Sequence, residues 1–148
     1  MEKNKLKFLI HTDGGSRGNP GPSAIGVVIE GGEIGKKNYE EYIGKATNNE
    51  AEYRAVIFAL KKIKSLIGGE KIKKSLVEIR MDSELLVKQL NGKYKIKEKN
   101  IQELFLEAWN LRLDFGEIIF RHISRDDNND DDRLVNQALN KEESKLNI

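Results

Sequence analysis

Residues 6–29 read LKFLIHTDGGSRGNPGPSAIGVVI, in which two short apolar runs flank a turn rich in glycine and proline. The runs at 6–12 and 24–29 have the length and composition typical of strands buried in a sheet. A third, more polar strand is expected at 36–44, because the preceding Gly31-Gly32 is typical of a hairpin turn. The first third of the chain therefore predicts three consecutive strands.

Apolar residues follow a helical spacing after residue 47. They recur on one face of 48–66, and Gly68-Gly69 then ends this helix, since glycine commonly terminates helices. Beyond it we expect a strand at 75–81, helices at 83–91 and 100–114, a strand at 118–123 and a helix from about 129. Asn100 and Glu103 resemble a capping pair. The order β-β-β-α-β-α-α-β-α predicts an α/β fold with a five-stranded mixed sheet flanked by helices.

Composition limits the class of protein. A chain of 148 residues with 38% hydrophobic residues can form one core, so we expect a single domain over 1–148, with its core at about 6–140 and a short C-terminal helical tail. No apolar run approaches the roughly 18 residues of a membrane span, and the first residues lack a signal-peptide pattern, so we expect a cytoplasmic protein without membrane contact. The net charge of +2 neither requires nor excludes a nucleic-acid partner.

Four acids that are far apart in the sequence occupy positions that a sheet and its helices can bring together. Asp13 ends the first strand and Asp82 the fourth, while Glu52 and Asp132 lie in the first turns of two helices, on faces that also carry apolar residues. A charge that faces inward costs several kcal/mol unless it is paired or bound to a metal ion. The chain has no cysteine, so carboxylates and two histidines are the available ligands, and carboxylates favour Mg²⁺. Two such ions about 4 Å apart would assist phosphodiester hydrolysis.

Each of these acids also has a purely structural explanation. Asp13 stands before two glycines, as in a turn, and Asp82 is typical of a helix cap. Glu52 is favoured near a helix N-terminus by the helix dipole, and Asp132 would complete a capping box with Asn129. Taken singly, every acid is better explained in this way. Only their combination favours catalysis.

Four segments carry that combination. They are TDGGSRGNPGP at 12–22, TNNEAEY at 47–53, DSELLVKQLNG at 82–92, and HISR to DRL at 122–134. In order and spacing they resemble the motifs of type 1 ribonuclease H, over roughly residues 6–140. The resemblance implies the ribonuclease H fold, in which the first three strands are antiparallel and the carboxylates lie at the centre of the sheet. It also implies an endonuclease that hydrolyses the RNA strand of RNA–DNA hybrids and leaves 5′-phosphate and 3′-hydroxyl ends.

The resemblance implies which acids bind metal. Asp13, Glu52, Asp82 and Asp132 match the family's catalytic, metal-binding residues, which hold two Mg²⁺ ions during catalysis, with Mn²⁺ as an alternative. Among three consecutive acids Asp132 is assigned this role because it lies ten residues after a family histidine and directly before Arg-Leu. Its neighbour Asp131 fills a position that is usually small and uncharged, and we expect it to face solvent as the helix turns.

The two histidines are expected to differ in role. His122 matches the family histidine that assists proton transfer or product departure, so it is assigned to the catalytic residues. His11 falls inside the first strand and has no motif support, so we expect it to be structural.

The resemblance also implies which residues contact a hybrid. The turn after Asp13 lacks the Gly-Lys-Ser/Thr ending of a nucleotide-binding loop, and its glycines would let the backbone approach the 2′-hydroxyls that distinguish RNA from DNA. The expected substrate-binding residues are Gly14, Gly15, Ser16, Asn19, Thr47, Asn48 and Asn49. Thr47 also has a structural explanation, since Thr47-x-x-Glu50 is a capping box. Glu84 stands where many relatives have glutamine, which leaves its role in binding open.

The expected partner is an RNA–DNA hybrid bound by a monomer, with no protein partner. The Lys/Trp-rich handle that many family members carry is not expected, because only 91–97 intervenes between the helices. The basic residues expected to contact phosphates instead are Lys88, Lys93, Lys95 and Lys97.

Two other functions remain as alternatives. The first is a non-catalytic hybrid-binding module of the same fold, against which the intact acids argue. The second is a relative of this fold that acts on DNA junctions or transposon ends. The segments TNNE and GNPG are more typical of a protein that recognises RNA than of one that recognises only DNA.

Overall fold

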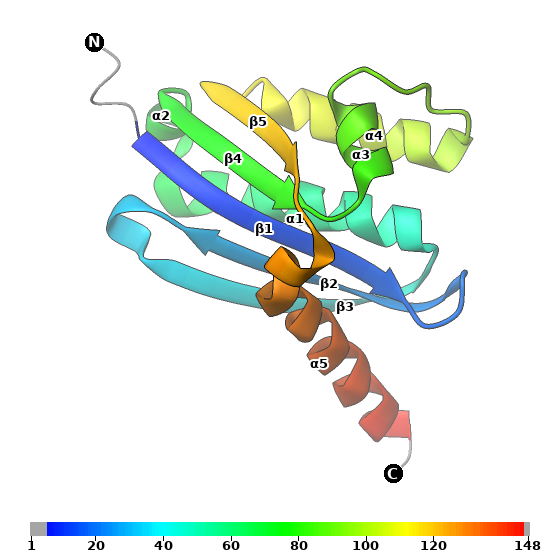
Figure 1. The fold of residues 1–148 in the computed structure, drawn as a ribbon. Helices are drawn as coiled ribbons and strands as arrows, with labels where there is room; N and C mark the ends of the chain where they lie inside the picture. Colours follow the sequence, from blue (N-terminus) through cyan, green and yellow to red (C-terminus); the bar gives the residue numbers. More distant parts are fainter. Residues whose placement is uncertain (1–5, 147–148) are drawn as a thin grey trace.

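The computed structural model describes residues 6–146, and its centre is a five-stranded sheet in the order β3-β2-β1-β4-β5 (Figure 1). The strands are β1 (Leu6–Ser16), β2 (Gly21–Glu30), β3 (Lys36–Ala46), β4 (Ser75–Met81) and β5 (Glu117–His122). β2 is antiparallel to both β1 and β3, whereas β4 is parallel to both β1 and β5. The mixed sheet predicted from the sequence is therefore confirmed.

Helices cover both faces of this sheet (Figure 1). They are α1 (Asn48–Ile67), α2 (Gly69–Ile72), α3 (Glu84–Leu90), α4 (Lys99–Arg112) and α5 (Asn129–Leu146), with short 3₁₀ turns η2 (Gly32–Ile34) and η3 (Arg125–Asn128). Successive residues of a strand point to opposite faces. On β2, Ile25 packs into the large core under α1, while the adjacent Ala24 packs against α5. Within 6–146, no helix is long and apolar enough to cross a membrane.

The predicted elements differ from the observed ones mainly at their ends. β1 continues to Ser16, so Asp13 lies inside the strand and not at its end. α1 ends at Ile67 as the glycine pair predicts, but the single-turn helix α2 that follows was not expected. The predicted capping pair in α4 is wrong, because Glu98 is the N-cap residue and makes no side-chain capping bond. Asn100 instead hydrogen bonds to the carboxylate of Glu50. The hydrogen bond from the Thr47 backbone is the main cause that lowers the pKa of Glu50, and the bond from Asn100 lowers it further.

The contact between α1 and β1 positions the rest of the molecule. The face of α1 predicted to be apolar is fully buried at Ala55, Ala59 and Ile63, whereas Leu66, predicted on the same face near the end of the helix, is exposed. At its N-terminal end the helix crosses β1 so closely that a Cβ added to Gly14 would lie 2.3 Å from the backbone C and O of Ala51. Only glycine allows this approach, which brings the first turns of α1 directly over the strand.

Substitution of Gly14 tests that contact. Gly14→Ala should lower the free energy of unfolding by about 1–3 kcal/mol or more, because the added methyl group forces two backbones apart. Urea denaturation followed by circular dichroism measures the loss. The matched control is Gly69→Ala, where no atom lies within 4 Å of the added carbon. Equal stability of the two variants would contradict a close approach at Gly14.

Candidate active site

Three acids from separate elements meet at one end of the parallel strand pair. One carboxylate oxygen from each of Asp13, Glu52 and Asp82 lies within 4.8 Å of the others. The β1–β4 register pairs His11 with Arg80, so Asp13 and Asp82 both lie two positions further along their chains. Glu52 reaches them from α1, which can lie close to β1 because residue 14 is glycine. The sheet register and one helix contact thus assemble the cluster.

Asp132 joins these acids from the opposite face of the sheet. It lies in the first turn of α5 and is partly buried. Its side chain accepts a hydrogen bond from the protonated carboxyl group of Asp13, which helps to raise the pKa of Asp13. Together the four acids line a hollow of about 520 Å³. The four acids expected from the sequence therefore converge, three of them tightly and the fourth beside Asp13.

Burial and crowding make these acids hard to ionise together. The pKa of Asp13 is raised to about 9, first by burial and then by the charges of Asp82, Asp131 and Asp132. Burial raises the pKa of Glu52 to about 7, although a hydrogen bond from Ser83 opposes the shift. Among residues 6–146, no lysine or arginine forms an ion pair with any of the four acids. A divalent cation bound among them would supply the missing positive charge.

Asp131 is buried, and the expectation that it faces solvent is wrong. Its side chain is 1% exposed, and neither carboxylate oxygen has a hydrogen-bond partner. α5 lies so close to β2 that a Cβ on Gly26 would meet the Asp131 carbonyl oxygen at 2.2 Å. Asp131 lies four residues before Val135 and seven before Ala138, both buried, so this helical spacing was a signal that could have placed it inward. Burial, then the nearby acids, raises its pKa to about 8.

Two basic side chains lie at the edge of the hollow. His122 is exposed at the end of β5, and its Nε2 lies 3.2 Å from the backbone oxygen of Asp82. Arg125, in η3, lines the hollow and lowers the pKa of Glu52. Sequence reasoning did not single out Arg125, although it ends the HISR segment. His11 is half-buried within β1 and lines a separate pocket, and its expected structural role stays a prediction.

The residues predicted to bind substrate lie along the end of β1, in the turn after it and at the start of α1. The backbone N–H of Ser16 donates to Asn48 Oδ1 at 2.9 Å, and the backbone N–H of Asn48 donates to Asn19 Oδ1 at 3.0 Å. Gly14, Gly15, Ser16 and Asn48 line the hollow. Asn49 instead lines a neighbouring groove that also contains Lys95 and Lys97.

Thr47 has the structural role that its spacing predicts. Its hydroxyl accepts from the backbone N–H of Glu50 at 3.2 Å, and the Glu50 carboxylate accepts from the backbone N–H of Thr47 at 2.9 Å. This reciprocal capping box begins α1. It therefore fixes the helix turn that precedes Glu52.

Known proteins resemble this chain over nearly its whole length. A family model described as reverse transcriptase-like matches residues 11–138. The bifunctional protein Rv2228c of Mycobacterium tuberculosis is 37% identical over 136 residues, which cover 90% of this chain but only 36% of that protein. The chain thus spans about a third of the length of this relative. Ribonuclease HI of Halobacterium salinarum is 38% identical over 128 residues, covering 86% of this chain and 61% of that protein.

A solved structure shows the same likeness in three dimensions. The crystal structure of LC11-RNase H1 in complex with RNA/DNA hybrid has a TM-score of 0.84 and 42% identity to this chain. The match covers 90% of this chain and 97% of the other. The two proteins are therefore similar in both sequence and fold along almost the entire length of each chain.

Asp131 should make stability depend on pH. Its pKa is about 8 in the folded protein against 3.8 ordinarily, so its favourable contribution is complete below about pH 4 and is lost as the pH rises toward about 8. Asp131→Asn, which cannot ionise, should therefore raise the free energy of unfolding by about 1–3 kcal/mol near pH 8 and by less near pH 5. Urea denaturation in EDTA at both pH values measures the difference.

The exposed neighbour Asp130 is the matched control. A hydrogen bond from Lys36 lowers the pKa of Asp130, so Asp130→Asn should not stabilise the protein at either pH. A gain in stability from Asp130→Asn equal to that from Asp131→Asn would show that the buried charge is not the cause.

Proposed function

Because the chain belongs to the type 1 ribonuclease H family, we propose that it is an endonuclease that hydrolyses the RNA strand of RNA–DNA hybrids. The observation that carries the proposal is the cluster of Asp13, Glu52 and Asp82, with their oxygens within 4.8 Å of one another and Asp132 beside them. The hybrid bound by LC11-RNase H1, a protein 42% identical to this chain, supports the choice of substrate. The products carry 5′-phosphate and 3′-hydroxyl ends.

The four acids fit a divalent metal centre. Their ligand atoms are hard carboxylate oxygens, which suit Mg²⁺ and also accept Mn²⁺. The raised pKa values of Asp13 and Glu52 mean that a bound cation would favour the loss of their protons. We assign two Mg²⁺ ions to Asp13, Glu52, Asp82 and Asp132. When bound, such ions lower the pKa of water and offset the charge that builds up on a phosphodiester.

The chain's own residues orient the hybrid around this centre. The side-chain oxygens of Asn19 and Asn48 already accept backbone N–H groups of the protein, so their amide N–H groups stay available to donate. A donor in this position suits sugar oxygens and base-edge acceptors in the minor groove of a hybrid. The backbone of Gly14, Gly15 and Ser16 lies beside the same hollow, and Asn49 lines the neighbouring groove. We assign Thr47 to a phosphate of the DNA strand.

His122 is assigned to proton movement. Its imidazole lies at the rim of the site, against the backbone oxygen of Asp82, and its exposed ring can exchange a proton with water. This position suits transfer of a proton to the leaving 3′-oxygen or release of the product. The metal-binding acids themselves do not need to act as proton donors.

Several expectations about the whole protein stay predictions. They are a single domain over 1–148, a monomeric state without a protein partner, and a cytoplasmic location. The curated relatives named above extend well beyond the part that this chain matches, so the activity and partners of the whole protein are part of the proposal.

Cleavage assays test the proposed function directly. End-labelled hybrid, double-stranded RNA and double-stranded DNA are incubated with and without Mg²⁺. The expected result is Mg²⁺-dependent cleavage of RNA in the hybrid, lowered at least about 100-fold by Asp13→Asn, since one metal ligand is lost. Asp114→Asn, which removes a partly exposed acid paired with Lys64, is the control and should keep full activity. Full activity of Asp13→Asn would refute the metal centre, whereas hybrid binding without cleavage would identify a non-catalytic module.

Salt dependence tests the basic surface. The double variant Lys95→Ala/Lys97→Ala should weaken hybrid binding and reduce the slope of log K against log salt by roughly 0.9 for each lysine that contacts a phosphate. Lys73→Ala/Lys74→Ala removes two exposed lysines just before β4 and serves as the control. Fluorescence anisotropy over a salt series, in Ca²⁺ to limit cleavage, gives both slopes. An unchanged slope in the first variant would exclude Lys95 and Lys97 from the interface.

A further inference from the structure

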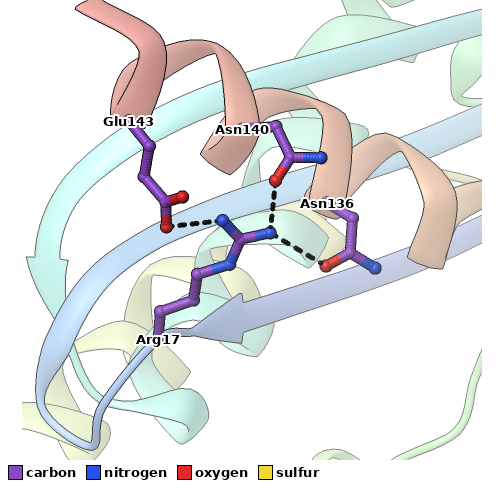
Figure 2. A network of polar contacts seen from close by, with 4 residues as sticks. All are labelled: Arg17, Asn136, Asn140 and Glu143. Atoms are coloured by element: carbon purple, nitrogen blue, oxygen red, sulfur yellow. Dashed lines mark hydrogen bonds and ion pairs between the residues drawn. The ribbon is translucent and has the colours of Figure 1, made fainter. Parts of the chain in front are cut away.

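Arg17 ties the turn after β1 to a distant helix. Its guanidinium donates from Nη1 to Glu143 Oε1 at 2.6 Å, and from Nη2 to Asn140 Oδ1 at 2.8 Å and Asn136 Oδ1 at 3.4 Å (Figure 2). The three acceptors lie at positions i, i+4 and i+7 of α5, so they form one face of the helix. The single side chain of Arg17 therefore spans about two turns of α5.

Helix α5, to which Arg17 is hydrogen bonded, also carries an acid of the active site. Asp132 lies one turn before Asn136, and Asn136 Nδ2 donates to the backbone oxygen of Asp132 at 3.2 Å. This bond leaves Asn136 Oδ1 available to accept from Arg17. Arg17 and Asn136 both line the hollow that contains the acids. The contact thus lies within one helical turn of the fourth acid.

The opposite side of the same turn is tied to the helix that carries Glu52. Ser16 donates through its backbone N–H to Asn48 at the start of α1, and Asn19 accepts from the backbone N–H of Asn48. The turn itself is closed by the backbone N–H of Arg17, which donates to the Pro22 oxygen at 2.8 Å. The segment 16–22 therefore bridges α1 and α5, two helices that contribute acids from opposite faces of the sheet.

We propose that Arg17 is a positioning residue, which holds the sugar-binding turn 16–22 in register with the metal-binding acids. The inference rests on the proposed function and extends it to a residue that does not itself touch the substrate. An arginine suits this role because its planar guanidinium presents several donors in a fixed fork, and bonds to a carboxylate are charge-assisted. Lysine could satisfy only part of the acceptor set. Three of its five N–H donors are engaged by α5, which directs the guanidinium toward the helix.

Removing either half of the contact should have the same effect. Arg17→Met and the double variant Asn140→Ala/Glu143→Ala should each raise KM for the hybrid about tenfold while kcat changes less than about twofold, since the acids stay in place and only the binding turn is loosened. Combining all three changes should add little beyond either alone. Arg17→Lys should restore only a small part of the lost affinity.

Hydrogen exchange gives a readout that does not depend on activity. The amides of Ser16 and Arg17 are hydrogen bonded within or beside the turn, so both should exchange about ten times faster in Arg17→Met and in the α5 double variant. Lys141→Met is the matched control, because Lys141 forms an ion pair of the same kind from α5 to Glu40 of β3, away from the turn. It should leave both KM and exchange unchanged.

Three results would overturn the inference. A raised KM in Arg17→Met that Arg17→Lys repairs, with no effect of the α5 variant, would mean that Arg17 binds a phosphate directly. Unchanged exchange at Ser16 and Arg17 in both variants would mean that the contact does not hold the turn. A fall in kcat as large as the rise in KM would mean that Arg17 acts on the position of the acids and not on the turn. Absence of cleavage in the unmodified protein would refute the proposed function, while the exchange result would still be measurable.

Discussion

The carboxylates of Asp13, Glu52 and Asp82 repel one another with oxygens gathered within 4.8 Å, and burial strengthens that repulsion. Each acid is carried by a different backbone element, so the packing of these elements and not any local segment keeps them together. The sheet register sets two of them side by side, and the close crossing of α1 over Gly14 adds the third. The packed core thus holds together a set of charges that would separate in a looser structure, and that set is what a divalent cation would bind.

The scaffold around this cluster is organised by contacts that leave little room for change. Glycine at 14 and at 26 lets α1 and α5 approach the sheet on its opposite faces, one beside Ala51 and the other beside Asp131. The capping box at Thr47 sets where α1 begins and hence where Glu52 points. On the other face, Val135, Ala138 and Leu139 pack α5 against Ala24, which sets the position of Asp132. Packing and capping therefore decide the geometry of the acids.

Asp131 shows that the site is more acidic than its motifs require. A fifth carboxylate, fully buried and without a hydrogen-bond partner, lies next to the fourth acid and contributes to the raised pKa of Asp13. Such a group costs folding free energy, and natural proteins keep buried charges of this kind mostly near functional sites. Its position against β2 follows from the rotation of α5, which also sets the orientation of Asn136, Asn140 and Glu143 toward Arg17.

The order of the strands and main helices and the mixed sheet could be predicted from the chain alone, because strand length and helical spacing act over a few residues. The resemblance of the motifs singled out the four acids, whose catalytic role stays a proposal. Local spacing also placed the capping box at Thr47 correctly. Local spacing could not decide how far each element continues, so the true end of β1 and the N-cap of α4 were missed. Three features became visible only when the elements were packed together: Asp131 faces inward from α5, Arg125 reaches the acids, and Arg17 contacts a helix 119 to 126 residues away. These features depend on the rigid-body position of one element against another, which is a property of the whole packed core and not of any local stretch of the chain.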